Sequence, residues 1–137
     1  MLMDSRSDST LAGAVALYAL ASLMHFAHNA EFLHEYPNLP ASITRSSVYL
    51  AWLGLAVIGF GGFTLYRVGW RRCGLVFLGA YATLGLYGLL HYTRAPVAAH
   101  TAMMNFTIWL ECVAAIVLLL VIGATPGGGT TTEEAGT

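Results

Sequence analysis

Four long apolar segments, separated by short polar or proline-containing stretches, constrain this chain more than any other feature of its sequence. Each is close to the roughly 20 residues that an α-helix needs to cross the hydrocarbon core of a bilayer. A segment in lipid must satisfy its own backbone hydrogen bonds, which favours helices here because a four-stranded barrel could not close. We therefore predict spanning helices at about residues 10–32, 46–67, 73–92 and 101–124.

The connections between these segments are short and contain helix-breaking residues. Pro37 and Pro40 follow the first segment, and Pro96 follows the third, and proline lacks the N–H that a helix interior requires. Short connections make consecutive helices antiparallel neighbours. We therefore predict an all-α, integral membrane four-helix bundle with up-down-up-down topology and both termini on the same side. Residues 1–125 form its single domain, and residues 126–137 are expected to be a flexible polar tail.

Charged residues are scarce in this chain. Hydrophobic residues make up 57% of the sequence and charged residues only 9%, whereas soluble domains carry about 25% charged residues. The sequence has no lysine, and its net charge is -1. This composition argues against a nucleic-acid partner, because such a surface needs clustered basic residues. The expected partner is the lipid bilayer, together with further copies of the chain or a larger membrane complex.

The distribution of arginines predicts an orientation. The N-terminal tail and the turn between the second and third segments carry four of the six arginines, and the opposite side carries Arg45 and Arg94. Basic residues are enriched on the cytoplasmic side of membrane proteins. We therefore expect both termini to be cytoplasmic, with the chain in a bacterial inner membrane.

Polar side chains follow one face of three of the predicted helices, at the spacing of three and four residues that aligns side chains on a helix. In chain order the three sets are Tyr18, Ser22, His25 and Asn29; Thr83, Tyr87, His91 and Arg94; and His100, Met104, Thr107 and Glu111. Ionisable groups at membrane depth are costly and usually face a protein interior. The three sets are therefore expected to face inward.

The three polar sets are also expected to meet at one depth. The fourth helix starts outside, so Glu111 lies about 15 Å deeper than His100 at 1.5 Å per residue. The first and third helices run outward, which brings His25 and His91 to the level of Thr107. The sequence therefore predicts one polar cavity in the outer half of the bundle.

Imidazole and carboxylate groups are the usual ligands of iron, copper and zinc. The candidate ligands are His25 and His28 on the first helix, His91 on the third, and Glu111 and His100 on the fourth. A haem b held between His25 and His91 is the second cofactor hypothesis. The absence of any cofactor is equally compatible with the sequence, since histidines near a membrane interface often only bind a nearby carbonyl or tyrosine.

Other polar residues are candidates for catalysis or for orienting a cofactor. Glu111 and His25 are the candidate catalytic pair, because an ionisable residue inside a membrane protein is by default a functional hypothesis. Tyr18, Tyr87 and Asn29 are candidate cofactor-binding residues that orient the imidazole rings.

Three functions fit these observations. The first is a small membrane protein whose His/Glu site binds a transition metal or haem in a redox or other enzymatic role. The second is an accessory subunit of a membrane complex, in which interhelical hydrogen bonds set helix packing. The third is a proton-coupled carrier or a lipid-modifying enzyme. The sequence does not decide whether the protein is an enzyme.

Overall fold

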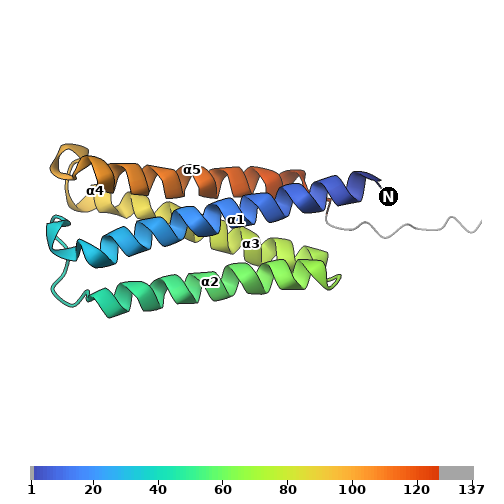
Figure 1. Ribbon diagram of the computed structural model, residues 1–137, viewed down its shortest axis with the longest axis horizontal. Coiled ribbons are helices and arrows are strands. Elements are labelled where there is room, and N and C mark those ends of the chain that lie inside the picture. Colours follow the sequence, from blue (N-terminus) through green and yellow to red (C-terminus); the bar gives the residue numbers. More distant parts are fainter. Residues whose placement is uncertain (1, 127–137) are drawn as a thin grey trace, which may run out of the picture.

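The computed structural model describes residues 2–126, and all of their regular secondary structure is helical (Figure 1). Four segments in this range are long and apolar enough to cross a membrane, namely Arg6–Glu31, Arg45–Arg67, Arg71–Arg94 and Ala102–Ala124. The prediction of an all-α protein with four candidate spans is therefore confirmed. The predicted tail lies outside the described residues from residue 127 onward.

Two helices match their predicted spans to within one residue. Helix α2 comprises Arg45–Arg67, and helix α5 comprises Ala102–Ala124. Thr44 and Thr101 precede these helices, and the side-chain oxygen of each accepts a hydrogen bond from the backbone N–H three residues later. These caps fix the starts of the two helices, because they satisfy N–H groups that have no partner inside the helix.

Helix α1 is longer than predicted and comprises Leu2–Glu31. The helix therefore begins before residue 10, where the spanning segment was predicted to start. The Thr10 hydroxyl donates to the carbonyl of Arg6 at 2.9 Å, as a threonine within a helix can. Past its C-terminal end, a short 3₁₀ turn at Leu33–Glu35 (η1) leads into the connection to α2.

The third segment is not one regular α-helix. It consists of α3 (Arg71–Gly85), the 3₁₀ stretch η2 (Leu86–Leu90) and the short helix α4 (His91–Arg94). A second 3₁₀ turn, η3 (Val97–Ala99), then precedes α5. The third spanning segment thus changes its helical pitch in the half of the bundle that was expected to carry the polar site.

This change of pitch overturns one prediction. A 3₁₀-helix turns about 120° per residue and an α-helix about 100°, so the five residues of η2 add about 100° of rotation. Thr83 and Tyr87 are exposed, the latter to 60%, whereas His91 is half-buried. The expectation that Thr83, Tyr87 and His91 share one inward face is therefore wrong.

Each long helix packs against two others. Helix α1 contacts α2 and α5, and α3 contacts the same two helices (Figure 1). Side-chain pairs join the helix ends. Near the start of α1, Asp8 accepts hydrogen bonds from Tyr66 at 2.6 Å and Arg71 at 3.2 Å. At its other end, Glu31 accepts from Tyr49 at 2.8 Å and pairs with Arg45 at 2.6 Å.

The apolar core occupies the part of the bundle nearest the α2–α3 turn. It is formed by buried residues of all four long helices, among them Leu11, Tyr18, Tyr66, Leu78, Tyr81 and Leu118. Gly74 lets the backbones of α2 and α3 approach, since a Cβ there would lie 2.5 Å from the Tyr66 amide nitrogen. The polar residues lie beyond this core, towards the ends joined by the longer connections.

Candidate functional site

Two of the three predicted polar faces are buried, and both point into the bundle. The buried side chains are Tyr18, Ser22 and His25 on α1, Met104, Thr107 and Glu111 on α5, and His100 just before α5. The last residue of the first set, Asn29, is half-buried at the edge of the site. Helices α1 and α5 pack directly against each other, so these two faces form the centre of the site.

At this centre His25 faces Glu111. Nε2 of His25 lies 3.7 Å from Oε2 of Glu111, and the two side chains are only 3% and 1% exposed. The distance is that of an ion pair and is longer than a direct hydrogen bond. Gly88 of η2 borders the carboxyl group, since a Cβ at this position would lie 3.4 Å from Glu111 Oε2. Three segments of the chain therefore enclose the pair.

Thr107 determines which nitrogen of His25 carries a proton. The Thr107 hydroxyl donates to the carbonyl of Met104 at 3.1 Å, and Nδ1 of His25 lies 3.4 Å from the same oxygen. A hydroxyl that already donates can only accept from a second partner, so Nδ1–H of His25 donates to Thr107. Nε2 is therefore left to face the carboxyl group of Glu111.

Two buried oxygen atoms close to this pair form no hydrogen bond of good geometry with the described residues, although the Ser22 hydroxyl is near enough to the Glu111 carboxyl group to interact with it. They are Oγ of Ser22 and Oε1 of Glu111. An unsatisfied buried polar atom typically costs about 1–3 kcal/mol, so it calls for a functional or structural explanation. The described side chains thus satisfy the hydrogen-bonding groups of this site only in part.

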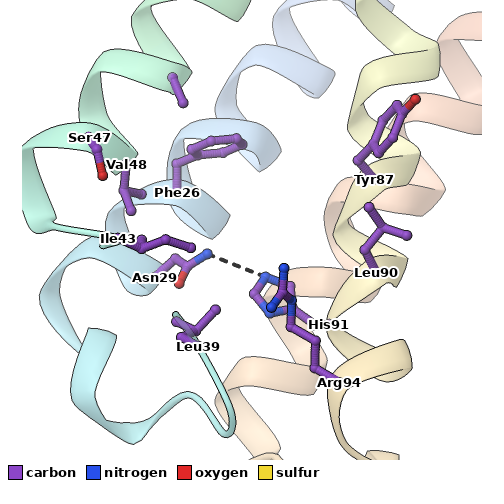
Figure 2. Close-up of a pocket in the computed structure, with 11 residues that line it drawn as sticks. Phe26, Asn29, Leu39, Ile43, Ser47, Val48, Tyr87, Leu90, His91 and Arg94 are labelled. Atoms are coloured by element: carbon purple, nitrogen blue, oxygen red, sulfur yellow. Dashed lines mark hydrogen bonds between the residues drawn. The ribbon is translucent and has the colours of Figure 1, made fainter. Parts of the chain in front are cut away.

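His91 connects the buried pair to the edge of the bundle. Its ring lies edge-on to that of His25, with 5.5 Å between the ring centroids. The amide Nδ2 of Asn29 donates to Nε2 of His91 at 3.3 Å, as drawn in Figure 2. The 100° added by η2 brings His91 to this position, and the hydrogen bond from Asn29 joins α1 to α4.

The two remaining candidate metal ligands have other contacts. His28 Nδ1 and the Tyr36 hydroxyl are hydrogen-bonded at 2.9 Å, and burial raises the pKa of Tyr36 to about 12. Nδ1–H of His100 donates to the carbonyl of Pro96 at 3.1 Å. His28 and His100 therefore lie around the central groups His25, His91 and Glu111 rather than among them.

The metal hypothesis gains no complete ligand set from this arrangement. Within residues 2–126, no group of three or more histidine, cysteine, aspartate or glutamate side chains is placed to hold a metal ion. His25 and Glu111 face each other, and the ring of His91 lies at 77° to the ring of His25. The hypothesis of a haem b between His25 and His91 stays a prediction.

The two candidate tyrosines lie apart from the imidazole rings. The Tyr18 hydroxyl donates to the carbonyl of Tyr81 at 3.2 Å and fills the space beside Gly85. Tyr87 is at the rim, with its hydroxyl directed away from His91 (Figure 2). No hydrogen bond joins either tyrosine to a histidine in the described structure, so their expected role as orienting residues stays a prediction.

A pocket of about 330 Å³ adjoins His91. It lies between α1, the connection to α2, the start of α2 and the η2–α4 stretch (Figure 2). Its lining residues include Phe26, Asn29, Leu39, Ile43, Val48, Tyr87, Leu90, His91 and Arg94. The sequence signalled the polar members of this set, but the contributions of the connection could not be found from helical spacing.

Comparison with protein-family models, curated proteins and solved structures finds no match to this chain. The fold and the site define a class in physical terms: an all-helical protein with four candidate membrane-spanning segments. Within it a buried His–Glu pair lies one imidazole ring away from a ligand-sized pocket.

Proposed function

We propose that this chain is an integral membrane protein whose four candidate spans cross the bilayer antiparallel. Every long helix carries strongly exposed apolar side chains, for example Leu20, Val57, Val76 and Leu120. Such a surface suits lipid and not water. The arginine distribution favours cytoplasmic termini and a bacterial inner membrane.

Within this protein, the buried His25–Glu111 pair acts as a general acid–base group for a membrane-soluble ligand in the pocket beside His91. The observation that carries the proposal is the burial of both partners at 3.7 Å with His91 between them and the pocket. A positioned proton donor or acceptor next to a bound substrate is the basis of acid–base catalysis. The proposed class is therefore a lipid-modifying or other membrane enzyme.

The shared proton is the chemical basis of this function. Nδ1–H of His25 is held by Thr107, so the proton between Nε2 and Glu111 can reside on either partner. Both forms of the pair have no net charge, and such a pair avoids the large cost of an isolated charge in a region of low dielectric constant. A proton leaving the pair towards the pocket would bind Nε2 of His91 in place of the hydrogen bond from Asn29, and His91 would then release the hydrogen on its Nδ1 to the pocket.

Infrared titration of the protein in lipid vesicles tests the proposal. We expect Glu111→Gln to remove one carboxyl band and to change the titration of His25 at the same time. His25→Asn should shift the same carboxyl band. The matched control is Glu31→Gln, on the same helix as His25 but at its exposed end, which should leave the titration of His25 unchanged. If the titration curve of His25 were the same in the wild type and in Glu111→Gln, the proposal would be contradicted.

The accessory-subunit hypothesis makes a different prediction for the same variants. If the polar interior only sets helix packing, Glu111→Gln and His25→Asn should lower stability in proportion to any loss of activity. Under our proposal Glu111→Gln, which is nearly isosteric, keeps the fold while losing proton exchange. Thermal unfolding monitored by circular dichroism separates the two outcomes.

A transition-metal site is the second candidate function. It is favoured by one observation, the buried Glu111 carboxyl group, whose Oε2 lies 3.7 Å from Nε2 of His25 and whose Oε1 forms no hydrogen bond of good geometry with a described residue. Iron, copper or zinc bound by His25 and Glu111 would need a third ligand, which His91 could supply after turning its ring. Elemental analysis of protein purified from metal-replete cells should then show stoichiometric metal that Glu111→Gln removes. Loss of the same metal in His34→Asn, a change at an exposed histidine, would assign it to surface binding.

A further inference from the structure

The pocket beside His91 has a polar end and an apolar body. Asn29, His91 and Arg94 lie together at one end, whereas Phe26 and Val48 contribute to the body (Figure 2). Pockets that bind small molecules are mostly apolar with a few polar groups that fix orientation. The pocket therefore has the layout of a site for an elongated amphiphile.

This pocket opens sideways, towards the region that lipid would occupy. Helix α2 packs extensively against α3 but makes few contacts with η2 or α4, so these elements separate along the pocket. Leu90 and Tyr87 form its rim and are both strongly exposed. A hydrocarbon chain could thus pass between α2 and η2 without crossing the packed core.

The polar end of the pocket offers donors and a positive charge. Among the described residues the Arg94 guanidinium has no ion-pair partner. Nε2 of His91 accepts from Asn29, so its Nδ1 carries a hydrogen that is available for donation. A guanidinium fork matches the two oxygens of a carboxylate or phosphate. An anionic head group is therefore the complement of this end.

We infer that the pocket binds a single-chain amphiphile, with its anionic head against Arg94 and His91 and its hydrocarbon chain between α2 and η2. The volume of about 330 Å³ is near the lower end of the roughly 300–1,000 Å³ found for ligand sites, which favours one chain over two. The inference deepens the proposed function, because this amphiphile would be the ligand of the His25–Glu111 pair.

Photocrosslinking of the full chain in phosphatidylcholine vesicles tests the inference. The probe is a long-chain fatty acid with a diazirine in its chain, and mass spectrometry of peptides locates the label. We expect labelling around Phe26 and Val48, competed by unlabelled fatty acid. A single-chain phosphate of equal length, used as a second competitor, decides between carboxylate and phosphate as the better head group. Labelling spread over lipid-facing residues such as Leu120 would overturn the inference.

Two variants examine the polar end and the apolar body separately. Arg94→Gln should weaken binding about tenfold, the loss expected for one charge-assisted hydrogen bond. Val48→Phe should block labelling by filling the body. The matched control is Arg45→Gln, because Arg45 lies on the same side of the bundle but pairs with Glu31. Equal binding by wild type and Arg94→Gln would refute the role of Arg94, and unchanged labelling in Val48→Phe would refute the location.

The inference and the proposed function fail in different ways. If the acid–base proposal is wrong, His25 and Glu111 titrate independently while the fatty acid still labels the pocket. If the amphiphile inference is wrong, coupled titration persists and specific labelling is absent. Glu111→Gln should retain labelling, since Glu111 does not line the pocket. Circular dichroism of each variant shows whether the helices are intact.

Discussion

Thr107 holds His25 in one tautomer, because its hydroxyl donates to the carbonyl of Met104 and can only accept from Nδ1–H of His25 at 3.4 Å. The consequence is that His25 presents a lone pair or a shared proton to Glu111. A single threonine hydroxyl on α5 thus determines how a residue on α1 takes part in the site.

Replacing Thr107 should remove the preference of His25 for one tautomer. Thr107→Val keeps the shape of the side chain and removes the acceptor, so we expect both tautomers of His25 to become populated. Loss of one buried hydrogen bond should lower the free energy of unfolding by about 1 kcal/mol. Nitrogen NMR of labelled histidine measures the tautomers. Thr83→Val, at an exposed position, is the control and should leave His25 unchanged.

Gly88 leaves room for the carboxyl group of Glu111. A Cβ there would already lie 3.4 Å from Oε2 of Glu111 and 3.8 Å from Ile108, so Gly88→Val should displace the carboxyl group from His25. Overpacking of this kind costs about 1–3 kcal/mol. Gly79→Val meets open space and is the matched control. Equal unfolding temperatures for the two variants would contradict the described packing.

Tyr36 should make stability depend on pH in the alkaline range. Burial raises its pKa from 10.0 to about 12. A raised pKa in the folded state stabilises the protein fully below the unfolded value, and this contribution is lost as pH rises from about 10 to about 12. Two pKa units correspond to roughly 2–3 kcal/mol. The measurement is the free energy of unfolding of the wild type and of Tyr36→Phe at both ends of this pH range. The wild type should lose more stability than Tyr36→Phe as the pH rises.

The close approach of α2 and α3 depends on Gly74. A Cβ at this position would lie 2.5 Å from the Tyr66 nitrogen and 2.6 Å from the Gly62 carbonyl oxygen, and backbone atoms cannot move aside as a side chain can. We expect Gly74→Ala to destabilise the protein by at least about 1–3 kcal/mol. Gly61→Ala, where nothing lies within 4 Å, should be neutral or stabilising by up to about 1 kcal/mol. Unfolding in mixed micelles measures both variants.

Helical spacing predicted much of the fold and part of the site. The second and fourth predicted spans match α2 and α5 to within one residue, and the sets from Tyr18 to His25 and from Met104 to Glu111 are buried. These features depend on regular α-helix, for which the residue number alone gives the direction of a side chain.

Other parts of the site depend on irregular backbone. The position of Tyr36 near His28 follows from the connection after α1, where Asn38 has a positive φ of 57° and donates to the Arg94 carbonyl at 2.8 Å. Side-chain periodicity carries no information about such a path. Likewise, the spacing of polar residues by three and four positions does not show that Leu86–Leu90 forms a 3₁₀-helix.

The 3₁₀ stretch has an effect on length as well as on direction. Its rise is about 2.0 Å per residue against 1.5 Å for an α-helix, so the five residues of η2 extend the third segment by about 2.5 Å. This is close to half of a helical turn. His91 therefore reaches the level of Asn29 on α1 with fewer residues than a regular helix would need. The backbone of η2 therefore determines which residue of α1 the His91 imidazole can contact.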